Sequence, residues 1–331
     1  MQRVVVLGMG GTIAGVARPG MADGQYEAGV LAVDALLQGR RIPAGWAAAA
    51  EQVASIDSKD LSWAHWQALT AALARHLGSP DVGGVVLTHG TDTLEETACL
   101  LDWLHDQRLP VVLTAAMRPA TAPDADGPAN LDAALAAVAA LAAAGLGGVW
   151  VAVHGCLWRA REVRKAHSHA IDAFDGGGAP PAARWDEAAA AWVPDRAWGA
   201  RPPQAPLWAW FAQQASPRVA CVFSHADADG WLVRAALAAA AQGEPLDGLV
   251  VACTGHGTVH AALEAQLVEA ARQGVVVWRA SRAARGGVTP TADARWPATG
   301  TLTAGQARMA LALQLLRAPE RPDVLGYLLA R

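Results

Sequence analysis

Two threonines in this chain follow glycine turns that come directly after apolar, strand-like runs. Residues 3–7 are mostly β-branched, and a Gly-rich turn leads from them to Thr12. Residues 84–87 form a second apolar run, after which a turn brings Thr91 and Asp92 to the start of an apolar helix. Free backbone N–H groups and the helix dipole favour negative charge at such a helix start. A hydroxyl group placed there can attack a small polar substrate once a neighbouring group polarises it.

Other uses of these two turns have to be weighed against nucleophilic chemistry. Thr and Asp are common capping residues, so Thr91, Asp92 and Thr93 could simply cap the helix that follows them. The turn at 8–15 is not a dinucleotide fingerprint, because Ile13 stands where G-x-G-x-x-G requires its last glycine. No Gly-Lys-Ser/Thr follows, which excludes a P-loop. The residues alone leave both capping and catalysis open for the second turn.

A candidate for the polarising group is Lys165. It follows the apolar run at 148–154, so we expect it in a loop beyond the end of a strand. A lysine beside a carboxylate can act as a proton acceptor when its surroundings lower its proton affinity. Among its basic neighbours in 161–167, Lys165 could equally belong to a solvated loop. The catalytic interpretation gains weight only from its combination with the two threonines.

Alternating strand and helix patterns predict an α/β fold with a parallel, doubly wound sheet in a larger N-terminal domain and a smaller α/β C-terminal domain. We place the domains at 1–197 and 218–331, joined by a Pro- and Trp-rich linker at 198–217. Sites in such sheets lie beyond the carboxyl ends of the strands, where Thr12 and Thr91 fall. The expected N-terminal strands lie near 4–7, 48–54, 84–87, 111–114 and 149–153, with helices at about 63–77, 94–105 and 130–144. In the C-terminal domain we expect strands at 218–223, 249–253 and 275–278, and final helices at about 304–316 and 323–329.

Composition argues for a small-molecule enzyme and against several other classes. The formal charge of the 331 residues is −4 with no basic stripe, so we expect no nucleic-acid partner. No apolar stretch approaches the length of a membrane span, and the first strand begins so early that we expect no signal peptide. The four cysteines form no Cys-x-x-Cys pair, which is typical of reduced core residues. Together these features predict a cytoplasmic protein.

The ten histidines raise the question of a metal site. His256 and His260 have the i, i+4 spacing of zinc ligands on a helix, but they lack the glutamate of His-Glu-x-x-His and a third ligand. His167 and His169 form a second close pair, also without further ligands. We therefore expect no metal and no other cofactor.

The chain resembles the bacterial-type L-asparaginases, the two-domain asparaginase/glutaminase family that hydrolyses side-chain amides. Residues 10–14 match the first signature of that family, although Met9 stands where a threonine usually precedes it. Residues 88–97 match the second signature almost residue for residue. Further matches occur at 116–119, 126–128, 130–131 and 161–165, and more weakly through Arg282 and Gly286 to 300–302. The resemblance thus covers essentially the whole chain.

The resemblance implies roles for the residues that would do the chemistry. Thr12 would attack the amide carbon to give an acyl-enzyme and ammonia, and Tyr26 would hydrogen-bond it from a mobile loop. Asp92 and Lys165 would polarise Thr91, which would then activate the water that hydrolyses the ester.

The same resemblance implies a set of substrate contacts. Ser58 and Asp92 would hold the α-carboxylate and the α-amino group of the substrate, and the carbonyl of Ala116 would contact the departing amide. Backbone N–H groups near Thr12 and Thr91, with Gly11 beside them, could form an oxyanion hole.

The resemblance also implies a homotetramer built as a dimer of dimers, with each site completed by a neighbouring subunit. The acidic residue lent to that site would be Asp293, which is one methylene shorter than the usual glutamate. Thr258 stands where the family often has asparagine. Both departures bear on substrate preference, so the expected reaction is hydrolysis of L-asparagine, with L-glutamine as a weaker or comparable substrate.

Three alternative functions remain open beside this expectation. The first is an enzyme that prefers glutamine. The second is the related subunit that feeds ammonia to a tRNA amidotransferase, which usually has an extra N-terminal domain. The third is a non-catalytic protein that binds amino acids, although binding alone requires neither two threonines nor a lysine.

Overall fold

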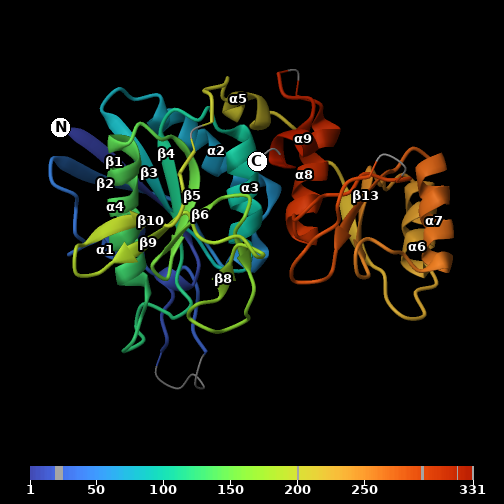
Figure 1. Cartoon of the computed structure of the whole chain (residues 1–331), viewed down its shortest axis with the longest axis horizontal. Helices are drawn as coiled ribbons and strands as arrows, with labels where there is room; N and C mark the ends of the chain where they lie inside the picture. The colour runs from blue at the N-terminus through green and yellow to red at the C-terminus, as the bar shows by residue number, and fades with distance from the viewer. Residues whose placement is uncertain (19–24, 200, 292–293, 319, 330–331) are drawn as a thin grey trace. The chain divides into compact units, whose positions relative to one another are not determined.

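The computed structural model describes residues 1–18, 25–199, 201–291, 294–318 and 320–329. The chain divides into two compact units, Met1–Gln213 and Gln214–Arg331, and each is described by itself (Figure 1). The division falls within the stretch that the sequence indicated as a linker. Asp293 lies outside the described residues.

The first unit is built on an eight-stranded sheet in the order β10-β9-β6-β5-β4-β3-β1-β2. Its five parallel strands are β1 (Gln2–Gly10), β2 (Trp46–Ile56), β3 (Val82–Thr88), β4 (Pro110–Thr114) and β5 (Gly148–Val153). All residues of β3, β4 and β5 are buried, as expected for parallel strands covered on both faces. These strands are the ones that the sequence predicted for the N-terminal domain.

The remaining strands of this sheet pair antiparallel, and the sequence analysis did not predict them. They are β6 (Cys156–Arg159), β9 (Ala183–Asp186) and β10 (Ala191–Pro194). The reversal occurs at His154 and Gly155, whose φ angles of 46° and 65° form a two-residue hairpin turn. A hairpin this tight returns the chain beside β5 in the opposite direction, so β6 cannot be parallel to it.

Helices cover both faces of the sheet. The helices of the first unit are α1 (Val33–Leu37), α2 (Trp63–Leu77), α3 (Leu94–Leu104), α4 (Gly127–Ala143) and α5 (Trp208–Phe211). Helices α1 and α4 lie on one face, and α2 and α3 lie on the other (Figure 1). Helix α5 packs its Phe211 ring against Trp63 of α2, with the ring centroids 4.7 Å apart, so it belongs to the first unit.

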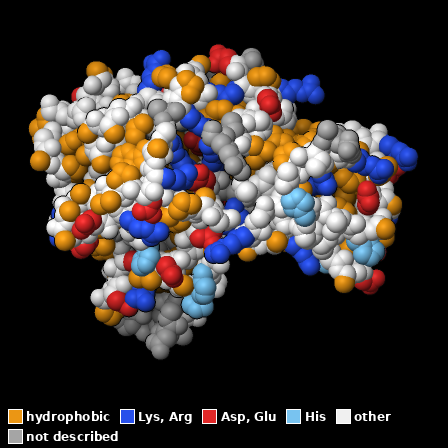
Figure 2. Space-filling model, viewed as in Figure 1, with side chains coloured by type: hydrophobic (Ala, Val, Ile, Leu, Met, Phe, Trp, Pro, Cys, Tyr) orange, Lys and Arg blue, Asp and Glu red, His pale blue; other side chains and the backbone are white. Residues whose placement is uncertain are grey.

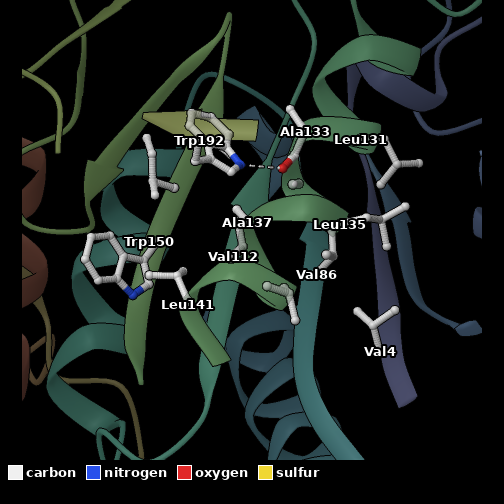
Figure 3. Close-up of a cluster of buried hydrophobic side chains, with 14 of the residues drawn as sticks. Val4, Val86, Val112, Leu131, Ala133, Leu135, Ala137, Leu141, Trp150 and Trp192 are labelled. Atoms are coloured by element: carbon white, nitrogen blue, oxygen red, sulfur yellow. Dashed lines mark hydrogen bonds between the residues drawn. The ribbon is translucent and has the colours of Figure 1, made fainter. Parts of the chain in front are cut away.

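A cluster of buried side chains fixes α4 on the sheet (Figure 3). Val4, Val86 and Val112 come from three neighbouring strands and meet Leu135 of α4, and all four are completely buried. Because side chains alternate along a strand, the residues next to these valines face α2 and α3 on the other side. At the edge of the cluster, the indole N–H of Trp192 donates to the Ala133 carbonyl at 3.0 Å.

The second unit has a three-stranded parallel sheet in the order β11-β12-β13. Helices α6 and α7 pack against one another beside this sheet, and α8 contacts all three strands. Leu249 and Val251 of β12 join Leu267 of α7 in one buried cluster. The elements are β11 (Val219–Phe223), α6 (Trp231–Ala240), β12 (Gly248–Cys253), α7 (Ala261–Arg272), β13 (Val276–Ser281), α8 (Ala304–Leu316) and α9 (Val324–Leu329). The prediction of a larger parallel-rich α/β unit followed by a smaller one is confirmed.

The strand order places a topological switch point between β1 and β3. The chain leaves β1 towards α1 on one face of the sheet, whereas it leaves β3 towards α3 on the other face. Loops that diverge in this way leave a gap above the strand ends, and ligands bind in α/β sheets at such switch points. Gly8 pairs with Thr88 at these ends, so the two threonine turns must start side by side.

Neither one face of the surface nor the described helices point to a charged or a membrane partner. On the face shown in Figure 2, Lys and Arg side chains lie among Asp and Glu side chains. Among the described residues, no helix combines the length and the hydrophobicity that crossing a bilayer requires.

No disulfide joins any of the four cysteines. Cys99 and Cys253 are buried, whereas Cys156 and Cys221 are partly exposed, so only two of the four are core residues. Burial raises the pKa of the Cys253 thiol to about 11 and that of Cys99 well above its ordinary value. A thiol with so high a pKa is a poor nucleophile at neutral pH.

Candidate active site

Three turns meet beyond the carboxyl ends of β1 and β3. Gly11 has a φ of 79°, and a Cβ atom added there would lie 2.4 Å from the Gly90 Cα. A Cβ added at Gly90 would lie 2.5 Å from the Ser58 Oγ. Only glycine permits so close an approach of two backbones. The turns that carry Thr12, Thr91 and Ser58 therefore form one contiguous site.

Thr12 begins a single turn of 3₁₀ helix, η1 (Thr12–Ala14), directly after β1. Its side chain is buried, and its Oγ1 lies 2.6 Å from the Tyr26 hydroxyl group. Gly29 N donates to the Gly11 carbonyl, which fastens the segment after Tyr26 to the same turn. The structure thus brings Thr12 and Tyr26 together as the sequence analysis expected.

Thr91 lies in a cluster with a lysine and a carboxylate. Lys165 Nζ donates to Thr91 Oγ1 at 2.9 Å and to Asp92 Oδ1 at 2.5 Å. The side chains of Thr91 and Lys165 are largely shielded, while 54% of the Asp92 side chain is exposed. The ammonium group therefore keeps a charged partner on the open side of the site and polarises the threonine hydroxyl on the other.

The segment that carries Lys165 is not the plain loop that the sequence predicted. Arg164–Lys165 is a two-residue strand, β7, that pairs with Phe174–Asp175, β8. In addition, the backbone N–H of Lys165 donates to Glu95 Oε2 of α3 at 2.7 Å. Acidic residues are common in the first turn of any helix, so the sequence carried no signal that Glu95 would hold a residue 70 positions away.

The capping interpretation is wrong for Thr91 and Asp92. The N-cap of α3 is Thr93, whose hydroxyl donates to the Ser58 carbonyl at 2.9 Å instead of capping the helix. The N-cap before α2 is Ser62. Ser58 itself is 3% exposed and lies in the 3₁₀ turn η2 (Ser58–Asp60), against Gly90. Its hydroxyl is placed to bind a ligand at the junction of the turns.

The turn that contains Ala116 is held by two side chains at the start of α4. The Asp126 carboxylate accepts hydrogen bonds from the backbone N–H groups of Met117 and Arg118, each at 3.0 Å. Asn130 Nδ2 donates to the carbonyl that precedes Ala116, at 2.9 Å. The sequence analysis noted Asp126 and Asn130 as motif residues but assigned them no role. They fix the conformation of the turn.

This turn is also bound to both threonine turns. Ala120 N donates to the Gly15 carbonyl at 2.9 Å, and His89 N donates to the Thr114 carbonyl at 2.9 Å. The backbone around Ala116 therefore keeps its position relative to Thr12 and Thr91.

Backbone donors at the site are available for a ligand. Within the described part of the chain, the N–H groups of Thr12 and Thr91 donate to no protein acceptor. Both lie beside the Gly11–Gly90 contact, where each turn enters a helical segment. Two such donors could bind the oxygen of a polarised carbonyl group.

Behind the second turn lies His89, which is 1% exposed. Its Nδ1 lies 2.8 Å from the Gly90 carbonyl oxygen, and its Nε2 lies 3.1 Å from Thr97 Oγ1. Burial lowers the pKa of His89 to about 4, and this effect outweighs the hydrogen bond to Gly90, which raises the pKa. The imidazole is therefore neutral at pH 7 and serves as a hydrogen-bonding group.

Metal chemistry finds no support in the part of the chain that the structure describes. No group of three or more His, Cys, Asp or Glu side chains there could hold a metal ion. The rings of His167 and His169 meet edge to face with their centroids 4.6 Å apart, and their loop follows Lys165.

Comparison with known protein families shows which family the chain belongs to. Residues 3–197 match the family "Asparaginase, N-terminal", and residues 218–324 match "Glutaminase/Asparaginase C-terminal domain". The chain belongs to the asparaginase family. Both threonine turns, Ser58 and Lys165 lie in the part that matches the N-terminal family.

Curated asparaginases align with nearly the whole chain. A protein named "Probable L-asparaginase periplasmic" from Haemophilus influenzae is 32% identical over 99% of this chain and 92% of its own length. "L-asparaginase 2" of Escherichia coli is 30% identical over 98% and 92%. The crystal structure of a "Probable Cytoplasmic L-asparaginase from Campylobacter jejuni" superimposes with a TM-score of 0.87 at 30% identity, covering both chains completely. The similarity therefore extends from sequence to fold.

The neutral state of His89 predicts a pH dependence of stability in this asparaginase. The pKa of a histidine is ordinarily 6.5, as in the unfolded chain, and the pKa of His89 in the folded protein is about 4. Between these two pH values the unfolded state therefore binds more protons than the folded state. The free energy of unfolding should therefore rise with pH across this window, and fall by up to roughly 3 kcal/mol on acidification through it.

The measurement is urea unfolding at pH 4.5, 5.5 and 6.5 for the wild type and for His89→Gln. The variant has no titrating group at this position, so the difference between the two pH profiles isolates His89 from the carboxylates elsewhere. Parallel profiles would show that folding leaves the pKa of His89 unchanged, contrary to the expectation.

Proposed function

We propose that this protein hydrolyses the side-chain amide of L-asparagine to L-aspartate and ammonia through a threonine acyl-enzyme. The observation that carries the proposal is the convergence of the Thr12–Tyr26 pair with the Thr91–Lys165–Asp92 cluster at one contiguous site. Relatives that cover the chain and are named L-asparaginases support the choice of substrate.

In the first half of the reaction, Thr12 Oγ1 attacks the carbon of the side-chain amide. Tyr26, 2.6 Å away, accepts a hydrogen bond from the hydroxyl group as its proton leaves. The developing oxyanion takes hydrogen bonds from the N–H groups of Thr12 and Thr91. When the C–N bond breaks, the nitrogen takes up the proton that left Thr12. It departs as ammonia near the Ala116 carbonyl. An ester between Thr12 and the aspartyl group remains.

In the second half, water attacks that ester. Lys165 and Asp92 polarise Thr91, whose Oγ1 accepts a proton from the attacking water as its own hydroxyl proton moves on towards the Thr12 oxygen. The Thr12 oxygen leaves the tetrahedral intermediate and regains its proton. The products are aspartate and the original enzyme, so one water molecule is consumed for each ammonia released.

The charged ends of the substrate fit the remaining groups. A free amino acid presents a carboxylate and an ammonium, which require donors and an acceptor respectively. The Ser58 hydroxyl donates to the α-carboxylate, and the exposed Asp92 carboxylate accepts from the α-ammonium. The same group thus serves the substrate and Lys165.

The experiment that tests the proposal is ammonia release by the purified protein from L-asparagine and, in parallel, from L-glutamine. We expect rapid release from asparagine, because the site supplies both a nucleophile and a hydrolytic partner. A higher kcat/KM for glutamine would make the enzyme a glutaminase, and a relative named "Glutaminase-asparaginase" aligns with 51% of this chain at 37% identity. Binding of aspartate with no turnover of either amide would leave only a binding protein.

The two threonines are expected to act as one unit. Thr12→Ala and Thr91→Ala should each lower kcat by at least about 10³-fold, and the double variant should be no slower than the worse single variant. Thr70→Ala, at a buried threonine in the middle of α2, is the matched control and should keep full activity. If either site variant turned over at the wild-type rate, that threonine would have no part in the chemistry.

We also propose a cytoplasmic homotetramer, a dimer of dimers, built from domains at 1–197 and 218–331 with the linker at 198–217. The four free cysteines and the name of the Campylobacter protein support the compartment, whereas the Haemophilus relative is named as periplasmic. Light scattering should give four times the chain mass of 34.2 kDa, and fractionation should place the protein with cytoplasmic markers. A monomer with full activity would remove Asp293 of a neighbouring subunit from the site.

A further inference from the structure

A line of buried hydrogen-bonding groups runs from α2 through α3 to the turn that carries Thr91. Trp66 Nε1 donates to Thr97 Oγ1 at 2.9 Å, and Thr97 Oγ1 lies 3.1 Å from His89 Nε2. The other ring nitrogen of His89 lies 2.8 Å from the Gly90 carbonyl oxygen. The Trp66, Thr97 and His89 side chains are at most 5% exposed, so water does not compete for these bonds. We call this line of four groups the Trp66–Gly90 relay.

The direction of every bond in the relay follows from the chemistry of its ends. An indole N–H can only donate, and a carbonyl oxygen can only accept. The ring nitrogen that faces Gly90 must therefore carry the hydrogen, and the neutral ring leaves Nε2 as an acceptor. Thr97 then accepts from Trp66 and donates to His89. No other arrangement satisfies all four groups, so His89 is held in the Nδ1–H tautomer.

The last bond of the relay fixes the orientation of a peptide group at the site. In a trans peptide, the carbonyl of one residue and the N–H of the next point in opposite directions. Because the Gly90 oxygen is drawn towards His89 on the buried side, the N–H of Thr91 points away from it. This N–H has no protein acceptor among the described residues, and Gly11 packs directly against the Gly90 backbone.

A glycine turn gains little rigidity from its own backbone. Gly90, like any glycine, has more conformational freedom than other residue types, and rotation of its peptide would turn the Thr91 N–H out of line. A donor stabilises a developing oxyanion only when it is already oriented, because reorientation during the reaction costs the stabilisation that it supplies. The relay supplies the missing constraint.

We propose that His89 is a positioning residue, and that the Trp66–Gly90 relay holds the Thr91 N–H ready to donate to the carbonyl oxygen of the substrate in the transition state. The proposal rests on the amidase function proposed above. It assigns a catalytic consequence to three side chains that touch neither the substrate nor the reacting hydroxyl groups.

Thr97 gives the sharpest test, because substitutions there change the relay without touching the turn. Thr97→Val keeps the shape of the side chain but removes the hydroxyl that fixes the tautomer of His89. We expect kcat to fall about 10-fold, a part of what the loss of an entire oxyanion donor costs. KM should change less than about 3-fold, since the substrate's charged ends bind elsewhere. Thr97→Ser restores the hydroxyl and should recover kcat to within about 3-fold of the wild type.

Two further variants separate positioning from general loss of stability. Trp66→Phe removes only the first donor and leaves Thr97 bonded to His89, so its kcat should lie between those of Thr97→Val and the wild type. Thr70→Val is the matched control, because this buried threonine donates only to Gln67 O of its own helix. A wild-type kcat in Thr97→Val would overturn the proposal. So would equal losses in Thr97→Val and Thr97→Ser, because only folding would then be affected.

A spectroscopic measurement tests the relay without an activity assay. In ¹⁵N-labelled wild-type protein, the imidazole nitrogens of His89 should show a protonated Nδ1 and an unprotonated Nε2. The opposite tautomer would refute the relay, whether or not the variants fold. If instead the tautomer is as expected and the wild type releases no ammonia, the function proposed above fails while the relay stands. These outcomes distinguish the two proposals.

Discussion

The site depends on the contact between two glycines. Gly11 and Gly90 approach so closely that a single Cβ atom on either would collide with backbone or with Ser58. This contact sets the separation of the two threonine turns, because each turn continues directly from its glycine into Thr12 or Thr91. Strand order makes the contact possible, since β1 and β3 are neighbours and the loops beyond them diverge to opposite faces of the sheet. A packing constraint in the backbone therefore determines where the hydroxyl groups lie.

Much of this arrangement could be predicted from the sequence, because the strongest local signals belong to the elements that build the site. Apolar β-branched runs marked the strands before Thr12 and Thr91, and parallel strands place their carboxyl ends at one edge of the sheet. The antiparallel strands β6, β9 and β10 were missed because they are short and half exposed, so periodicity marks them weakly. The direction of β6 comes from the left-handed turn at His154, where no glycine occupies the first position.

The residues that orient the site were harder to predict than the residues that react. Thr12 and Lys165 stand out because hydroxyl and ammonium groups at strand ends indicate chemistry. Glu95 and Asp126 bind backbone N–H groups of other segments, and Trp66 binds a side chain of another helix. Each also has an ordinary explanation where it stands, as a helix-start acid or an apolar core position. Only the tertiary structure shows which side chain lies beside which peptide group.

Thr91 is held in two different ways, and the difference has a physical reason. Its hydroxyl faces a charged pair, and Asp92 stays exposed because burial of both charges would cost more than their attraction returns. Its peptide is held from the interior, where charges are excluded and only neutral donors and acceptors can be satisfied without that cost. Burial in this interior disfavours a protonated His89 ring, which keeps the imidazole neutral. The charged side of Thr91 can therefore exchange protons with substrate and solvent while the neutral side keeps the backbone fixed.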